Sequence, residues 1–301
     1  MKIVITGANS AVGQAILRCG PNHEVTTNMF VAAVRSARAA ELLRSETGNA
    51  VEVVRISYDD PGSLDAAFQG ASAVIHLAGI LIETPDSNYE QANVASTRST
   101  VEAAKRSGVQ KIVLVSATGA DETSRNRYYR TKGQAEALVR ASGLNYTVLR
   151  APLLLGPGTA GGAALGRHVS HSPAKLIGGG RSLQQPLCVN DLARAAVAAT
   201  NPSVANNLVL DLVGPVSLPE RELVERAARL LGRQVRIGSI PKYWLSVVLA
   251  IRQRIGKPGF SRDALDVITS NTRLNPLPAA SALGIELTGI DEMIKGSLGQ
   301  G

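Results

Sequence analysis

Cysteine, histidine and aromatic residues are scarce in this 301-residue chain: it has two cysteines and four histidines, and Phe, Trp and Tyr together make up 3%. The two cysteines, Cys19 and Cys188, lie far apart, and neither has the partner spacing of a metal site. We therefore expect a reducing compartment, no disulfide framework and no bound metal. Because the chain opens directly on a strand-like segment, we also expect no secretory signal and a cytoplasmic location.

The last third of the chain has no apolar run long enough to span a bilayer. Its longest uncharged apolar stretch, residues 243–251, is bounded by Lys242 and Arg252. The formal net charge is +8, but the basic residues are scattered and few aromatics lie among them, which disfavours nucleic-acid binding. The arginines of this third could form a solvated basic face, or they could bind a peripheral membrane or protein partner. Residues 244–254 could form a helix on a membrane surface, or a helix in the core or at a dimer contact. The oligomeric state is left open.

Strand-like and helix-like segments alternate through the first half. Hydrophobic residues make up 45% of the chain, enough for a sizeable core. We expect strands at residues 2–5, 30–34, 51–55, 73–76, 111–115 and 146–149, and helices at 12–18, 38–45, 63–68, 89–107 and 128–142. Alternation of this kind predicts an α/β fold, a Rossmann doubly wound parallel sheet with helices on both faces.

The amino-acid composition of the chain changes after Pro152. Residues 156–166 are rich in Gly, Ala and Pro and are expected to form a loop over the sheet. Further helices are expected at 190–200, with Asn190 as its cap, and at 219–231, 244–254, 262–270 and 290–297, with a strand at 208–212. We expect a core of residues 1–155 and a smaller C-terminal lobe, residues 156–301, interleaved with the last core elements.

The run of residues 2–13 carries the first functional signal. A buried strand leads into a turn that contains Gly7, and a helix follows from Val12. This layout holds a dinucleotide pyrophosphate on a helix N-terminus, and it also occurs as a plain tight turn in other α/β proteins. Ser10 stands where the dinucleotide pattern has its middle glycine.

The second signal is the pair Tyr128 and Lys132, four residues apart and therefore on one face of a helix. A nearby ammonium favours tyrosinate and lowers the phenol pKa, which makes the tyrosine a usable general acid or base. Ser116 ends a buried strand shortly before this pair and could hydrogen-bond a substrate carbonyl. The alternatives are a surface Tyr–Lys pair and a strand-end turn serine.

Six motifs occur in the order seen in the short-chain dehydrogenase/reductases: Thr6-Gly7-Ala8-Asn9-Ser10-Ala11-Val12-Gly13, His76-Leu77-Ala78-Gly79, Asn93 in a long helix, Val115-Ser116-Ala117, Tyr128-x-x-x-Lys132 and Leu149-Arg150-Ala151-Pro152. The chain resembles their extended and atypical, epimerase-like branch over essentially its whole length. Within that branch it is similar to bacterial relatives of the accessory NAD(P)-binding subunit of respiratory complex I.

The resemblance implies a role for each matching position. The catalytic set would be Ser116, Tyr128 and Lys132, with Lys132 also on the nicotinamide ribose and Thr118 as an alternative to Ser116. The other implied cofactor-binding residues are Gly7, Asn9, Ser10, Ala11, Val12 and Gly13 around the pyrophosphate, Ser57 near the adenine, Leu77, Ala78 and Gly79 under the adenosine, and Ala151, Pro152 and Leu153 beside the nicotinamide.

The choice between NADP and NAD is a question of charge. An acidic residue after the second strand would bind the adenosine ribose and repel a 2′-phosphate, but this chain has Arg35, Ser36 and Arg38 there. Arginines give charge-assisted hydrogen bonds to a phosphate. We therefore expect NADP(H) in preference to NAD, with Arg35 as its principal partner and Arg38 either a second partner or a surface arginine.

The sequence also departs from the family pattern. The connection at residues 22–29 is long, and the interval from Ser116 to Tyr128 is short compared with the active branches. Three functions therefore stay open: an NADP(H)-dependent oxidoreductase acting on a small carbonyl or alcohol, a non-catalytic or weakly active NAD(P)-binding redox sensor or assembly protein, and, as a weaker alternative, a sugar-nucleotide epimerase.

Overall fold

The computed structural model describes residues 1–19, 28–254 and 259–299. Its centre is a seven-stranded sheet in the order β11-β6-β5-β4-β1-β2-β3, and every neighbouring pair is parallel. This confirms the predicted Rossmann sheet. The strands are β1 (Lys2–Thr6), β2 (Met29–Val34), β3 (Glu52–Arg55), β4 (Ala73–His76), β5 (Lys111–Ala117), β6 (Asn145–Ala151) and β11 (Leu208–Asp211).

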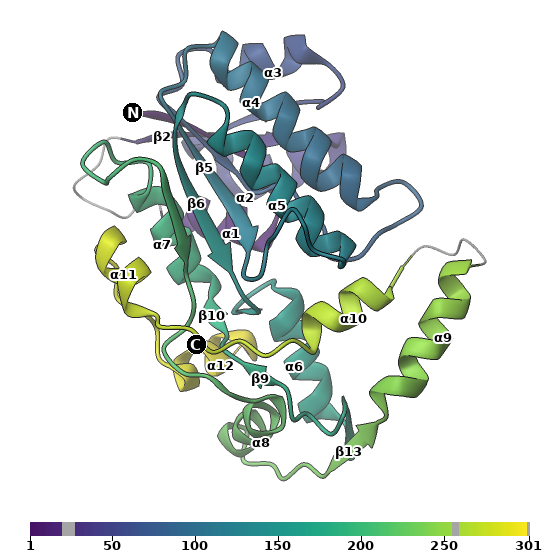
Figure 1. The fold of residues 1–301 in the computed structure, drawn as a ribbon. Coiled ribbons are helices and arrows are strands. Elements are labelled where there is room, and N and C mark those ends of the chain that lie inside the picture. The colour runs from purple at the N-terminus through teal and green to yellow at the C-terminus, as the bar shows by residue number, and fades with distance from the viewer. Residues whose placement is uncertain (20–27, 255–258, 300–301) are drawn as a thin grey trace.

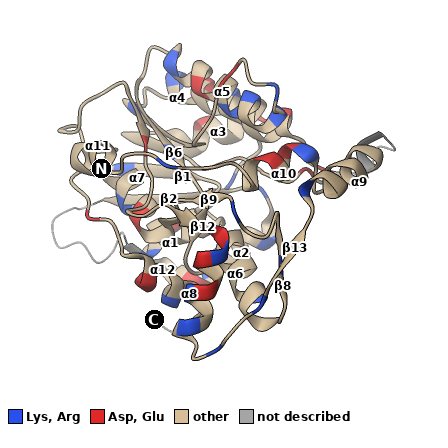
Figure 2. Cartoon of the chain, turned by 60° about the horizontal axis from the view of Figure 1, so that its bottom comes forward, with Lys and Arg blue, Asp and Glu red and all other residues tan. Residues whose placement is uncertain are grey.

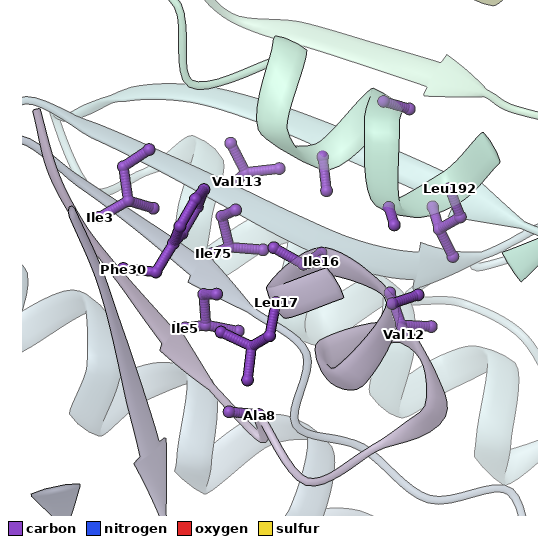
Figure 3. Close-up of a cluster of buried hydrophobic side chains, with 14 of the residues drawn as sticks. Ile3, Ile5, Ala8, Val12, Ile16, Leu17, Phe30, Ile75, Val113 and Leu192 are labelled. Atoms are coloured by element: carbon purple, nitrogen blue, oxygen red, sulfur yellow. The ribbon is translucent and has the colours of Figure 1, made fainter. Parts of the chain in front are cut away.

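Helices cover both faces of this sheet (Figure 1). One buried cluster joins the sheet to α1 (Ala11–Cys19), α2 (Ala37–Thr47), α7 (Val189–Ala198) and α11 (Leu277–Leu283). In Figure 3, side chains of β1, β2, β4 and β5 lie against α1 and α7. Two further clusters pack the opposite face against α3 (Pro61–Phe68), α4 (Ser96–Arg106) and α5 (Arg127–Arg140). The inner strands β1, β2 and β4 are apolar and buried on nearly their whole length, as burial on both sides requires.

Other elements after residue 153 form a fourth buried cluster. It joins α6 (Ala160–Ser170), α8 (Glu220–Leu230) and α12 (Ile290–Ser297) to short strands. Those strands are β7 (Leu154–Leu155), β8 (Ala174–Ile177), β9 (Leu183–Gln184), β10 (Leu187–Cys188), β12 (Leu218–Pro219) and β13 (Ile237–Ile240), and two more helices follow, α9 (Lys242–Arg254) and α10 (Arg262–Ile268). Within the described residues, no helix combines the length and apolar content needed to cross a bilayer.

The expected loop at residues 156–166 is wrong, because helix α6 begins at Ala160. The Thr159 hydroxyl caps this helix by accepting a 3.0 Å hydrogen bond from the Gly162 amide. The glycines serve close packing: a β carbon at Gly161 would lie 2.3 Å from the Leu154 oxygen. Glycine content alone therefore suggested a loop where it in fact allows a tight helix contact.

Gly70, Gly108 and Gly143 each follow a helix and have a positive φ, between +68° and +79°, which is the left-handed conformation that commonly ends a helix. The predicted cap at Asn190 is wrong, because α7 is preceded by Cys188 and Asn190 lies inside its first turn. Most of the long connection at residues 22–29, and the side chain of Cys19, lie outside the described residues.

Candidate functional site

The turn between β1 and α1 is built on two glycines that no other residue could replace without strain. Gly7 has φ +75°, and a β carbon there would lie 3.3 Å from the Ala78 amide nitrogen. A β carbon at Gly13 would lie 2.4 Å from the Ala8 carbonyl oxygen. The turn is therefore pressed closely against both its own helix and the segment after β4.

Ser10 caps α1. Its hydroxyl accepts a 3.1 Å hydrogen bond from the Gly13 amide, and its own amide donates to the Gly7 carbonyl oxygen over 3.0 Å. A serine in place of the usual glycine thus gives the helix an N-cap. The amides of Ala11 and Val12 have no acceptor within the helix because of their position in its first turn, so a phosphate at the helix N-terminus could accept from them, although neither residue is part of the cavity lining.

A cavity of about 850 Å³ opens at the carboxyl ends of β1 to β4. The strand order reverses between β1 and β4, and ligands of open α/β sheets bind at such a switch point. The predicted cofactor residues that line the cavity are Gly7, Asn9, Ser10, Arg35, Ser57, Leu77, Ala78 and Gly79. The lining thus brings together the Gly-rich turn, the end of β2 and the segment after β4.

Two arginines reach this cavity from neighbouring strands. Arg35 follows β2, and Arg55 ends β3, where it pairs with Val34 in register. Ser36 also lines the cavity, but its hydroxyl caps α2 by accepting from the Ala39 amide over 3.1 Å. Arg38 is exposed on α2 and is not part of the lining. The basic end of the cavity is therefore formed by Arg35 and Arg55, and no sequence motif singled out Arg55.

Lys132 reaches the other end of this region from α5. Its buried ammonium donates a 2.9 Å hydrogen bond to the Val115 carbonyl oxygen, and burial lowers its pKa to about 8. A β carbon at Gly79 would lie 3.3 Å from Lys132 Nζ. Because Gly79 lines the cavity, the predicted catalytic lysine and the cavity are adjacent.

Asn93 supports this junction. Its side-chain oxygen accepts a 3.2 Å hydrogen bond from the Ile80 amide, and its Nδ2 donates to the Thr131 hydroxyl over 3.0 Å. Asn93 is fully buried in a π-helical segment, Glu90–Ala95, that precedes α4. It therefore joins the segment after β4 to the helix that carries Tyr128 and Lys132.

Tyr128 stands in the first turn of α5 between two other tyrosines. Its ring centroid lies 5.8 Å from that of Tyr89 and 5.7 Å from that of Tyr129. Its hydroxyl makes no hydrogen bond with any residue that the structure describes. Burial, with smaller contributions from Tyr129 and Tyr89, raises the Tyr128 pKa. The expected lowering by Lys132 is not found, because the lysine ammonium is directed to Val115.

Ser116 is directed away from this tyrosine. Its hydroxyl donates a 2.6 Å hydrogen bond to Oε1 of the fully buried Glu136, which also accepts from Arg150 Nη2 at 2.7 Å. Ser116 lies on the α5 face of β5, as do Ile112 and Leu114. Its hydroxyl is therefore part of a buried ion-pair network between β5, α5 and β6.

Thr118 follows the end of β5 and is half-buried. Its amide donates a 3.1 Å hydrogen bond to the Ala151 carbonyl oxygen, and its hydroxyl has no partner among the described residues. Pro152 and Leu153 come directly after Ala151, and Leu153 accepts from the Leu187 amide over 2.9 Å. The predicted nicotinamide-side segment is thus joined by a hydrogen bond to Thr118.

The comparisons with known proteins agree with this geometry. Residues 7–179 match a family model described as NAD(P)H-binding. The chain belongs to this family. It is an extended short-chain dehydrogenase/reductase-like member, as the sequence motifs predicted.

Curated relatives of this NAD(P)H-binding protein include the ceramide reductase of Caulobacter vibrioides, 28% identical over 191 residues that cover 64% of this chain and 60% of that protein. Another is the mitochondrial NADH dehydrogenase [ubiquinone] 1 alpha subcomplex subunit 9 of Arabidopsis thaliana, 30% identical over 59% of this chain and 46% of that protein. The matched region therefore spans about half of these relatives' length.

Solved structures show the same fold. UDP-glucuronic acid 4-epimerase from Bacillus cereus in complex with NAD superposes with a TM-score of 0.78 and 16% identity, covering 100% of this chain and 98% of that one. The NADPH-dependent quinone oxidoreductase QOR2 of Escherichia coli, complexed with NADPH, superposes with a TM-score of 0.72 and 20% identity, covering 97% of this chain and 98% of that one.

Among the described residues, no group of three His, Cys, Asp or Glu side chains could hold a metal ion.

Proposed function

We propose that this NAD(P)H-binding protein is an NADP(H)-dependent oxidoreductase acting on a small carbonyl or alcohol. The observation that carries the proposal is the position of Lys132 Nζ beside Gly79, a residue of the cavity lining. This proximity supports a site that extends from the cavity toward the helix of Tyr128. A hydroxyl donor and a cofactor site are then adjacent, as a carbonyl reduction requires.

The chain's own residues fit this chemistry. A bound nicotinamide cofactor supplies the hydride. The amides of Ala11 and Val12 would hold its pyrophosphate, and Lys132 its nicotinamide ribose. Tyr128 would give a proton to the substrate oxygen, since its hydroxyl has no partner among the described residues; its raised pKa makes this phenol a weaker acid than a tyrosine in water and does not itself support the role.

The preference for NADP(H) is supported by the arginine pair. Arg35 and Arg55 line the same end of the cavity. Residues 34–38 contain no acidic side chain that would repel a 2′-phosphate. Asp59 and Asp60 also line the cavity, and Asp60 accepts from the Gly62 amide over 3.1 Å as the cap of α3. We infer that the 2′-phosphate binds between the two arginines.

One observation favours a second candidate, a non-catalytic NAD(P)-binding redox sensor or assembly protein. The Ser116 hydroxyl is held by Glu136, so it is not directed to substrate or to Tyr128. One relative, Ycf39 of Cyanophora paradoxa, is named as a photosystem II assembly factor, and the Arabidopsis relative is named as a subunit of a larger NADH dehydrogenase. For the oxidoreductase, the hydroxyl partner of Tyr128 would then be Thr118. Sugar-nucleotide epimerase stays the weaker alternative, supported by the fold of the epimerase structures.

Two assays on the purified protein separate these functions. NADPH binding is followed by the fluorescence of the nicotinamide, and NADPH oxidation is followed with a panel of aldehydes, ketones and quinones. The oxidoreductase is expected to oxidise NADPH with at least one carbonyl, and Tyr128→Phe is expected to abolish this turnover while binding persists. Binding without turnover on any substrate would favour the non-catalytic function, and failure to bind either dinucleotide would exclude both.

A further inference from the structure

Helix α9 stands out from the body of the protein with apolar side chains exposed. Figures 1 and 2 both show it projecting beyond α10, away from the central sheet. The exposed fractions are 75% for Tyr243, 67% for Trp244, 52% for Val248 and 58% for Ile251. Trp244, Val248 and Ile251 follow the i, i+4, i+7 spacing of a single helix face. This face is unpartnered within the described residues.

The opposite side of α9 fixes the helix to the protein. Leu249 is 3% exposed, and Lys242 Nζ lies 3.1 Å from Oδ1 of Asp266 on α10. The helix is therefore held in place by one side, while its apolar face is presented outward. Burial in the protein's own core does not account for that face.

The charge around α9 is positive. The helix contains Lys242, Arg252 and Arg254 and no acidic residue. The strands at its base add exposed Lys175 on β8 and Arg236 just before β13. Figure 2 shows basic segments along these strands and at the base of the helix. Asp263 and Asp266 of α10 are the acidic residues nearest in sequence, and Asp266 is paired with Lys242.

We propose that α9 docks the protein reversibly on an anionic bilayer surface. Tyrosine and tryptophan favour the membrane–water interface, because their rings are apolar and their polar atoms stay hydrated. A short helix with this aromatic pair, an apolar face and flanking basic residues is the kind that lies in that interface. The helix lies in the plane of the surface, with Trp244, Val248 and Ile251 in the headgroup–acyl boundary.

Charge distinguishes a bilayer from a second copy of the chain. Two copies joined through α9 would bring basic helices together, whereas anionic lipid headgroups complement them. The whole chain carries a formal charge of +8, which adds long-range attraction to an anionic surface. Docking does not depend on whether the protein turns over a substrate, so it stands apart from the proposed function.

Trp244 is the chain's single tryptophan, so intrinsic fluorescence reports on α9 directly. The full chain would be mixed with vesicles of phosphatidylglycerol and phosphatidylcholine, or of phosphatidylcholine alone. We expect the emission of Trp244 to shift to the blue, and to be quenched by lipids brominated near the headgroup, with the anionic vesicles. Added salt should weaken this binding.

The variant Val248→Asp/Ile251→Asp keeps the fluorescent probe and changes exposed positions, so it should fold. It is expected to bind anionic vesicles at least roughly tenfold more weakly. Leu277→Asp, at a 65% exposed position on α11, is the matched control and should bind like the wild type. An unshifted Trp244 emission with anionic vesicles would overturn the proposal. So would a concentration-dependent dimer, seen by light scattering, that the double variant abolishes while vesicle binding is unchanged.

Discussion

The ammonium of Lys132 donates a 2.9 Å hydrogen bond to the carbonyl oxygen of Val115. This contact fixes α5 against the end of β5 and leaves the lysine beside Gly79, at the edge of the cavity. Burial of the ammonium lowers its pKa to about 8 from 10.5. The burial that this position imposes therefore makes the charge of Lys132 sensitive to pH near neutrality.

The lowered pKa of Lys132 predicts a pH dependence of stability. Between pH 8 and pH 10.5 the unfolded chain retains a proton on this lysine that the folded chain has lost, so stability rises with pH across this window. Lys132→Met removes this titration. The unfolding free energy of the wild type, relative to the variant, should rise by about 3 kcal/mol across the window. Urea denaturation at both pH values measures it, and parallel pH profiles would show that the lysine is not buried as described.

The network of Ser116, Glu136 and Arg150 predicts a structural role for the serine. Ser116→Ala removes a hydrogen bond to a buried carboxylate, which should lower the unfolding free energy by about 1.5–3 kcal/mol. Glu136→Gln leaves Arg150 without its buried partner and should cost about 3 kcal/mol or more. Both are measured by denaturant titration.

Activity separates this role from catalysis. Ser116→Ala should retain turnover at temperatures where it is folded, whereas Thr118→Ala should lose it. If the Ser116→Ala protein were as stable as the wild type but inactive, Ser116 would have a catalytic role and not a structural one.

The close contact at Gly13 predicts a loss of cofactor binding on substitution. In Gly13→Ala the new methyl group would meet the Ala8 carbonyl at 2.4 Å, so the turn or α1 must move. We expect a loss of stability of about 1–3 kcal/mol and NADPH affinity reduced at least roughly tenfold.

Gly296→Ala is the matched control. Gly296 lies in α12 with nothing within 4 Å of the new methyl group, so alanine there should raise stability by up to about 1 kcal/mol. Normal NADPH binding by Gly13→Ala would mean that this turn does not hold the cofactor phosphates.

The arginine pair predicts cofactor preference. Arg35→Ala and Arg55→Ala should each weaken NADPH binding by roughly tenfold or more, because each removes a charge-assisted hydrogen bond to the 2′-phosphate. NADH binding should change little. Arg38→Ala, outside the cavity lining, serves as the control. Titrations of both dinucleotides test this, and equal losses for NADPH and NADH would show that the arginines do not read the phosphate.

The sequence alone predicted the parts of the site that follow from local pattern. Gly7 and Gly13 were found from the strand–turn–helix layout, and Arg35 from its place after a buried strand. Arg55 was missed because it joins the cavity only through the pairing of β3 with β2, a long-range relation that no local motif encodes. It too ends a strand, which was the available signal.

The sequence did not predict the directions in which the site side chains point. The motif order singled out Ser116, but the pleat of β5 turns its hydroxyl toward Glu136 on α5. Tyr128 and Lys132 share a helix face as predicted, yet the lysine bonds Val115 and so does not lower the phenol pKa. These outcomes depend on which buried acceptor each polar group finds, and that is decided by packing between elements.

The most direct test of a single site spanning the cavity and α5 is the NADPH dissociation constant of Lys132→Met beside that of the wild type, from nicotinamide fluorescence below pH 8. Lys132 lies beside Gly79 at the α5 side of the site, away from Arg35, so weaker binding in a folded variant would support a cofactor that reaches α5. We predict that the wild type binds NADPH and that Lys132→Met binds it roughly tenfold more weakly while staying folded. Wild-type affinity in a folded Lys132→Met protein would contradict the account.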